Sequence, residues 1–191
     1  GSQITDNQPI FSLPDLRASR YVLAGVHLMP QTGTWEPPIL NGVAVGYAYA
    51  RYAGIAFWYG CILVTSDGGA SWEDWTGDLL GVSDPQFLPS APLTDATIVT
   101  NGGDHKTWIV GFHGNQGNVI TGKLIPGGLG FGISPTGCGQ VPWIDLYGVH
   151  AYYPYPGITQ QFVWVTGRWG RGSMGGGYIN WGYQAADLTH Y

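Results

Sequence analysis

The segment at positions 55–72 reads IAFWYGCILVTSDGGASW, and its order of residue types decides which fold to expect. An aromatic-rich run at 55–60 ends in glycine, an apolar run at 61–65 follows, and Asp67-Gly68-Gly69 comes next. Short aromatic and β-branched runs bounded by Gly and Asp are typical of β-strands joined by tight turns. The segment therefore predicts two short strands and a turn.

Positions 107–122 and 162–182 repeat this order of strand, glycine, turn and returning strand, and positions 21–25 carry a weaker fourth copy. Trp58, Trp108 and Trp164 mark corresponding points, 50 and 56 residues apart. A period near 50 residues suits a four-stranded propeller blade, and about four such units fit 191 residues. We therefore expect an all-β fold of antiparallel hairpin repeats, arranged as a small β-propeller of about four blades. A β-sandwich or an irregular barrel is the alternative.

Composition supports packed β-structure in one domain, 1–191, with 1–19 as an extended N-terminal arm. The chain has 32 Gly, 9 Trp and 12 Tyr, whereas charged residues make up 10% of it, against about 25% on average. A net charge of −5 with scattered Lys and Arg argues against nucleic-acid binding. No apolar run approaches the roughly 20 residues of a membrane helix, so membrane insertion is not expected. The shortage of Lys and Glu indicates an extracellular or virion-surface protein.

The stretch TSDGGASW at 65–72 resembles the Asp-box, or BNR repeat, whose pattern is Ser/Thr-x-Asp-x-Gly-x-Thr/Ser-Trp. All five defining positions match: Thr65, Asp67, Gly69, Ser71 and Trp72. In sialidases and other Asp-box proteins this motif forms the hairpin turn between the two outer strands of a propeller blade, away from the active site. The resemblance covers these eight residues only, and it implies a structural role for them.

The residue types of this stretch suit a turn for physical reasons as well. Asp67 can accept hydrogen bonds from nearby backbone N–H groups, as in an Asx-turn. Gly68 and Gly69 tolerate positive φ angles, and Trp72 can fold back to cover the turn as an apolar plug. Asp67 is therefore interpreted as a turn residue and not as a catalytic one.

The chain offers little catalytic chemistry. Sialidases use three Arg, a Tyr–Glu pair and an acid, and no family motif places the Arg and Glu residues of this chain in those roles. Glycoside hydrolysis needs two carboxylates that face one sugar bond. Glu73 and Asp74 are interpreted instead as a solvated edge after the turn, and Asp95 as a turn cap. The five His lack metal-ligand spacing, so no catalytic residue, cofactor or metal is assigned.

Cys61 and Cys138 are the two cysteines of the chain. They are too few for a disulfide scaffold and do not form a C-x-x-C pair. Two interpretations stay open at this point: both are buried thiols, or they form a disulfide with each other.

Aromatic and arginine side chains in two predicted loops are the candidate ligand-binding residues. They are Tyr152, Tyr153 and Tyr155 in an aromatic–proline loop, and Arg168, Trp169 and Arg171 in a glycine-rich loop. Exposed rings can stack on the C–H faces of sugars, and Arg can bind hydroxyl or carboxylate groups. The sequence thus predicts a non-catalytic recognition domain for a glycan or cell-surface receptor, of the lectin-like or phage tail-fibre type. A homo-oligomeric virion decoration or assembly module is one alternative, and a glycoside hydrolase is another.

Overall fold

The structure is a computed structural model, and it describes residues 3–4, 18–29, 42–52, 55–76, 93–101, 104–113, 116–127, 130–142, 144–155, 161–169 and 176–183. Its strands are β1 (Gln3–Ile4), β2 (Ala18–Leu28), β3 (Gly42–Tyr52), β4 (Ile55–Thr65), β5 (Ser71–Asp74), β6 (Leu93–Asn101), β7 (Asp104–His113), β8 (Gln116–Gly127), β9 (Gly130–Pro142), β10 (Ile144–Tyr152), β11 (Phe162–Trp169) and β12 (Gly176–Tyr183).

These strands form three sheets, each built on a run of consecutive hairpins, with β1 added at the edge of the first sheet. The first sheet has the order β1-β5-β4-β3-β2, the second β6-β7-β8-β9 and the third β10-β11-β12. Every pairing is antiparallel except that of β1 with β5, which is parallel. The prediction of an all-β fold with antiparallel sheets is confirmed.

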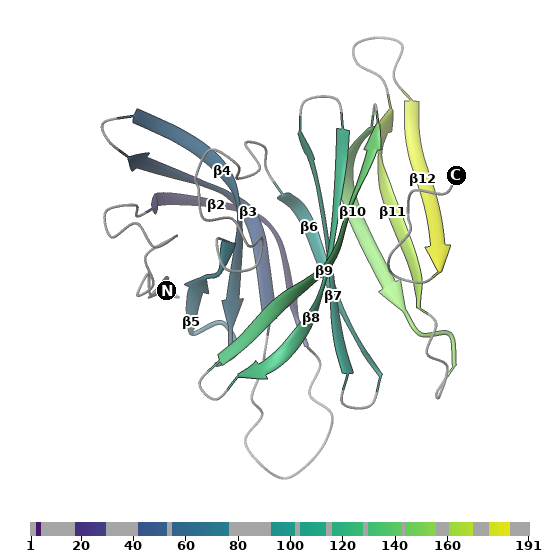
Figure 1. Ribbon diagram of the computed structural model, residues 1–191, viewed down its shortest axis with the longest axis horizontal. Helices are drawn as coiled ribbons and strands as arrows, with labels where there is room; N and C mark the ends of the chain where they lie inside the picture. Colours follow the sequence, from purple (N-terminus) through teal and green to yellow (C-terminus); the bar gives the residue numbers. More distant parts are fainter. Residues whose placement is uncertain are drawn as a thin grey trace.

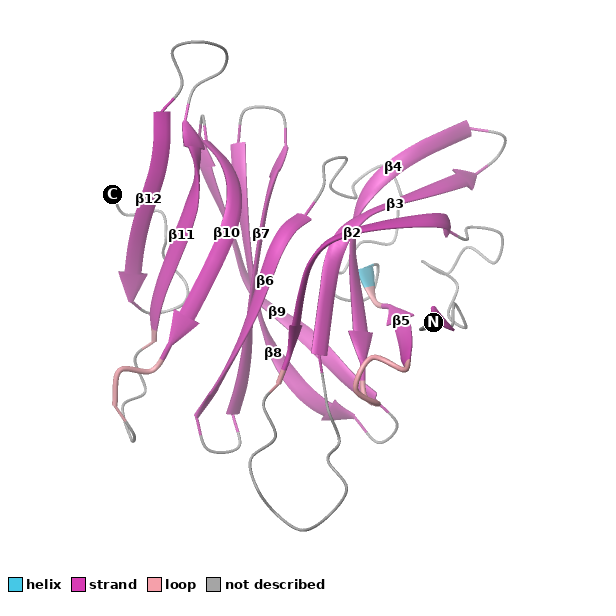
Figure 2. Ribbon diagram, turned by 180° about the vertical axis from the view of Figure 1, so that it is seen from behind, coloured by secondary structure: helices cyan, strands magenta, loops and turns pink. Residues whose placement is uncertain are grey.

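The three sheets stand side by side in a row, with the second sheet in the middle (Figures 1 and 2). The first strand of each later sheet packs on the sheet before it: β6 lies against β2 and β3, and β10 lies against β6 and β7. Two apolar clusters fill these contacts. One joins the first and second sheets through Val43, Val45, Ile62, Val64, Leu93, Ala96, Ile98 and Ile109. The other joins the second and third sheets through Val99, Trp108, Val110, Leu146, Val149, Ala151, Val163 and Val165.

The strand that opens the run of antiparallel hairpins in each sheet (β2, β6 or β10) carries a bulge at a corresponding position. The bulges follow three leucines, Leu23 in β2, Leu93 in β6 and Leu146 in β10. A glycine of the second strand pairs with each of these leucines: Gly46, Gly111 and Gly167. A Cβ on Gly46 would fall against the Val22 carbonyl and 2.8 Å from the Cα of Leu23, so the bulged backbone requires glycine there.

The predicted repeat is therefore real in part, but its alignment was wrong. The segments 55–60 and 61–65 are one continuous strand, β4, and not two. Trp108 and Trp164 lie on the second strands of their sheets, whereas Trp58 lies on the third strand of the first sheet. The weaker copy at 21–25 belongs to β2 of the first sheet. The described residues thus form three sheets where four units were predicted.

The glycine-rich segment 127–132 has a composition typical of a loop, yet its described residues lie in strands. β8 continues to Gly127, and β9 begins at Gly130 as the edge strand of the second sheet. An edge position tolerates Gly and Pro because an outward N–H is not needed for the ladder. Of the predicted N-terminal arm, residues 3–4 pair with β5 and residues 18–19 belong to β2, whereas 5–17 lie outside the described residues.

Candidate functional site

The turn between β4 and β5 is built around the carboxylate of Asp67. Its Oδ1 accepts hydrogen bonds from the backbone N–H of Ser71 at 2.9 Å and from the Thr65 hydroxyl at 2.8 Å. Its Oδ2 accepts one from the Ser71 hydroxyl at 2.5 Å. The Ser71 hydroxyl and backbone bonds are the main cause that lowers the pKa of Asp67 to about 2. The ionised carboxylate therefore closes the turn at neutral pH.

Two glycines and a tryptophan complete this turn. Gly68 and Gly69 have φ angles of 74° and 88°, in the left-handed region where glycine is favoured. The side chain of Trp72 is buried, and a Cβ on Gly69 would lie 3.4 Å from its ring. The hydrogen bonding of Asp67, the positive φ angles and the packing of Trp72 agree with the sequence analysis, and they describe a structural element.

Asp74 was predicted to lie on a solvated edge, and this prediction was wrong, because its side chain is buried. Its Oδ2 accepts hydrogen bonds from the hydroxyls of Tyr21 and Tyr59 at 2.9 and 3.1 Å. Its Oδ1 accepts the backbone N–H and the hydroxyl of Thr76 at 3.0 and 2.6 Å. Burial raises the pKa of Tyr59, with a further contribution from the nearby Asp74 charge. Through these hydrogen bonds, Asp74 links β5 to β4 and β2.

Glu73 is exposed, as predicted, and accepts a hydrogen bond from the indole N–H of Trp75 at 3.0 Å. Glu73 and Asp74 follow each other in β5, so their side chains point to opposite faces of the sheet. The pair is therefore not placed to face one sugar bond.

The predicted aromatic–proline loop, called the tyrosine loop below, holds Tyr153 and Tyr155, whereas Tyr152 is the last residue of β10. The Tyr153 hydroxyl accepts a hydrogen bond from Gln161 Nε2 at 2.6 Å, and Gln161 Oε1 accepts the indole N–H of Trp108 at 2.7 Å. Tyr153 thus links the second and third sheets. Tyr155 is exposed, and Tyr152 is exposed and stacks on Phe162 with ring centroids 5.8 Å apart.

The prediction of a glycine-rich loop was wrong for Arg168 and Trp169, because both lie in β11, at the other end of the third sheet. Tyr152 pairs with Phe162 at one end of the β10–β11 ladder, and Asp145 pairs with Arg168 near the opposite end. Arg168 is exposed. The side chain of Trp169 and the whole of Arg171 lie outside the described residues. The structure therefore does not bring Tyr152 and Arg168 into one site.

A group of aromatic and arginine side chains on the first sheet was missed by the sequence analysis. The ring of Trp58 lies 5.0 Å, centroid to centroid, from the rings of both Tyr47 and Tyr49. Arg51 Nε donates a hydrogen bond to the Tyr49 hydroxyl at 3.3 Å, and Arg20 pairs with Tyr49 across the β2–β3 ladder. Trp58 is 41% exposed, and both arginines are exposed. We call these five residues the aromatic–arginine platform.

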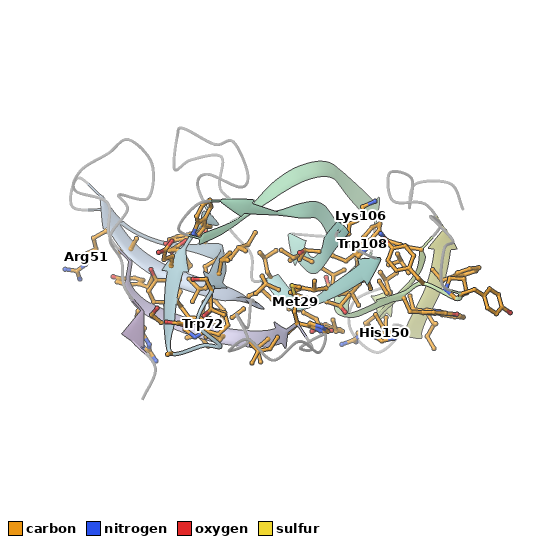
Figure 3. All side chains as sticks on the ribbon, turned by 90° about the horizontal axis from the view of Figure 1, so that it is seen from below. Met29, Arg51, Trp72, Lys106, Trp108 and His150 are labelled. Atoms are coloured by element: carbon orange, nitrogen blue, oxygen red, sulfur yellow. The ribbon has the colours of Figure 1, made fainter. Side chains whose placement is uncertain are left out.

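The platform lies on the face of the first sheet that packs on the second sheet, toward the end where β3 and β4 run away from that neighbour (Figure 1). Figure 3 shows Arg51 at the outer edge of the first sheet, pointing away from the other labelled residues. The signal in the sequence was the alternation of Tyr47, Tyr49 and Arg51, which places all three on one face of a strand. The same alternation is typical of any half-buried strand, so by itself it does not indicate a binding surface.

Asp95 is not a turn cap but a link between sheets. It lies in β6 directly after the bulge, and its Oδ2 accepts the backbone N–H of Val149 in β10 at 3.0 Å. Burial lowers the pKa of His27 in β2, Asp95 opposes this shift, and His150 in β10 adds to it. The bulged strands β2, β6 and β10 therefore come close together around Asp95.

Cys61 lies in β4 as a buried free thiol. Of the two interpretations that stayed open, the buried thiol therefore applies to Cys61, and the disulfide does not. Burial raises its pKa, with a smaller contribution from Asp74. Cys138 lies in β9, and its side chain is outside the described residues.

Among the described residues, no group of three or more His, Cys, Asp and Glu side chains is arranged to hold a metal ion. The same part of the chain contains no helix that is long and apolar enough to cross a membrane. Comparisons with family models, with curated proteins and with solved structures return no match for this chain.

Proposed function

We propose that this chain is a non-catalytic recognition domain that binds glycans through the aromatic–arginine platform. The observation that carries the proposal is the partly exposed ring of Trp58, held between Tyr47 and Tyr49 with ring centroids 5.0 Å from each. Rings fixed by their neighbours present an apolar face to a sugar at low entropic cost. Arg20 and Arg51 supply donors for hydroxyl or carboxylate groups beside that face.

We also propose that the three sheets are blades of a β-propeller and that residues 65–72 are an Asp-box. The supporting observations are the consecutive hairpins of each sheet and the turn geometry around Asp67. This turn joins β4 and β5, which are the later strands of the first sheet, as the resemblance implied. A surface location on a virion or outside the cell agrees with the low charge of the chain.

Glycan-array binding followed by titration of the glycans found tests the proposal. We expect Trp58→Ala to weaken binding by at least about tenfold, which corresponds to a lost contact of about 1.4 kcal/mol. Tyr155→Ala removes an exposed ring from the loop after β10 and serves as the matched control, with binding unchanged. Thermal melting of both variants checks that the fold is kept.

Two results would reject this function. The first is an array on which the wild-type chain binds no glycan. The second is a folded Trp58→Ala variant that binds as well as the wild type. If Tyr155→Ala lost binding instead, recognition would belong to the tyrosine loop and not to the platform.

An assembly module is the second candidate function. It is favoured by exposed apolar side chains on the two outermost sheets, such as Val26 and Ile179. Glycoside hydrolysis receives no such support, because Asp74 is buried among hydroxyl donors and Glu73 faces the other way.

A further inference from the structure

β2 and β10 carry the same sequence pattern in the same structural place. Both contain Leu-x-Gly-Val-His, at 23–27 and at 146–150, with the bulge after the leucine. In β10, Leu146 and Val149 are buried against the second sheet. In β2 the corresponding residues are Leu23 and Val26, which are 47% and 63% exposed.

The repeat gives each sheet two distinct faces. We call the face that carries the residue after the bulge (Gly25, Asp95 or Gly148) the front, and the face that carries the next residue (Val26, Ala96 or Val149) the back. The back face of β6 packs on the front of the first sheet, and the back face of β10 packs on the front of the second sheet. The sheets thus pack front to back, and each contact is made chiefly by a bulged first strand.

The front face of the third sheet has the same register as the front faces that are covered. Gly25 pairs with Val45, which pairs with Ile62, and Ile62 is fully buried under the second sheet. In the third sheet the corresponding row is Gly148, Thr166 and Ile179.

Corresponding side chains in these sheets differ in how much of their surface is exposed to solvent. Ile179 is 72% exposed although its counterpart Ile62 is fully buried. Trp164 is 38% exposed, whereas its counterpart Trp108 is buried between the second and third sheets. The front of the third sheet therefore has the residue types and register of a packing face while it is open to solvent.

We propose that a second copy of this chain covers this face, with its β2 seated on the front of the third sheet. The same contact in reverse covers the third sheet of the second copy, so two chains close a ring of front-to-back sheets. β2 fits because it repeats the bulge, Leu and Val that β10 uses on the second sheet. Gly148, on the front of the third sheet, allows the close approach of β2. It occupies the position that Gly25 has on the front of the first sheet, where β6 comes so near that a Cβ on Gly25 would lie 2.8 Å from the Cα of Asp95.

The number of sheets agrees with this closure. This closure rests on the propeller proposed above: propellers typically have about four to eight blades, so the three sheets that the described residues form are too few. Two chains supply six, which is within that range. The contact is heterologous, and it closes because each chain offers one front and one back.

The solution mass tests the inference, by size-exclusion chromatography with light scattering on the full chain. We expect the wild type to have twice the 20.5 kDa of one chain throughout the micromolar range. Val26→Lys and Ile179→Glu place a charge on the two opposite sides of the contact, and each alone is expected to give single chains. Tyr155→Lys, a charge at an exposed ring in the loop after β10, is the control that keeps the double mass.

Mixing the two single variants gives the sharper result. A pair made of one Val26→Lys chain and one Ile179→Glu chain has one contact with Val26 and Ile179 both intact, and a second contact in which Lys meets Glu. We therefore expect the equimolar mixture to regain the double mass that neither variant has alone. Far-UV circular dichroism of each variant confirms that the sheets are retained.

Two outcomes would overturn the inference. One is a wild-type chain with the mass of a single copy. The other is a wild-type chain of double mass for which Ile179→Glu gives single chains but Val26→Lys does not. In that case the third sheets of the two copies would face each other, and β2 would take no part in the contact. Neither outcome bears on glycan binding by Trp58, which lies on a different part of the first sheet.

Discussion

Among single residues, Asp67 has a stability contribution that depends on pH in a defined direction. Its folded pKa of about 2 lies below the ordinary value of 3.8, because the ionised carboxylate accepts hydrogen bonds from Ser71 and Thr65. A folded pKa that is lowered gives stability that is present above pH 4 and is lost as the pH falls toward 2. We expect Asp67→Asn to cost about 1 kcal/mol at pH 7, since the turn is exposed and solvent screens the charge.

Urea unfolding of the wild type and of Asp67→Asn at a series of pH values measures this effect. The difference between their free energies of unfolding should shrink between pH 4 and pH 2. Ser66→Ala, an exposed neighbour in the same turn, should follow the wild type at every pH. A difference that stays constant down to pH 2 would contradict the assigned role of the Asp67 charge.

The contrast between Asp67 and Asp74 shows which residue roles could be predicted from the sequence. The partners of Asp67 lie within four residues of it, so the local pattern was enough. Tyr21 and Tyr59, which bind Asp74, lie 53 and 15 residues away in the sequence, and no local pattern identifies such partners. The candidate ligand-binding residues were chosen by loop composition for the same reason, and the platform around Trp58 was not found.

At the scale of elements, the glycines opposite the three bulges have a steric role. A Cβ on Gly46 would meet the Val22 carbonyl and the Cα of Leu23, which are backbone atoms that cannot move aside cheaply. We expect Gly46→Ala to lower the free energy of unfolding by about 2–3 kcal/mol, the usual cost of forcing atoms into a packed site. Gly177→Ala is the matched control in β12, because nothing lies within 4 Å of its Cβ position.

Chemical denaturation of both glycine variants checks this prediction. Gly177→Ala should leave the stability within about 0.5 kcal/mol of the wild type or raise it slightly, because Ala has less freedom in the unfolded chain. Equal effects of the two substitutions would show that the bulge does not select glycine at 46.

The same bulges explain how far the elements could be predicted. Strand type was evident from aromatic and β-branched runs, and the glycines at 111 and 167 were correctly taken as repeat markers. The marker chosen in the first sheet was Gly60, whereas the one opposite the bulge is Gly46. A bulge is defined by pairing between two strands, so the alignment of the repeat required the register, which the sequence does not display.

At the scale of the whole molecule, the front-to-back order of the sheets leaves the back of β2 open at one end of the row and the front of the third sheet open at the other. In a single chain, Val26 and Ile179 stay in water although their counterparts in the other sheets are buried. Burying such side chains is favourable in proportion to the apolar area that is removed from water. Ring closure by a second copy therefore couples the stability of the fold to association.

This coupling has a measurable thermal consequence. When two chains fold and associate together, the melting temperature rises with protein concentration, by roughly 3 °C for a hundredfold increase at this chain length. Ile179→Glu, which cannot close the ring, should melt at one temperature at all concentrations and below the wild type. Differential scanning fluorimetry across that range separates the two behaviours, and a reversible wild-type transition that does not move with concentration would show that the exposed faces do not associate.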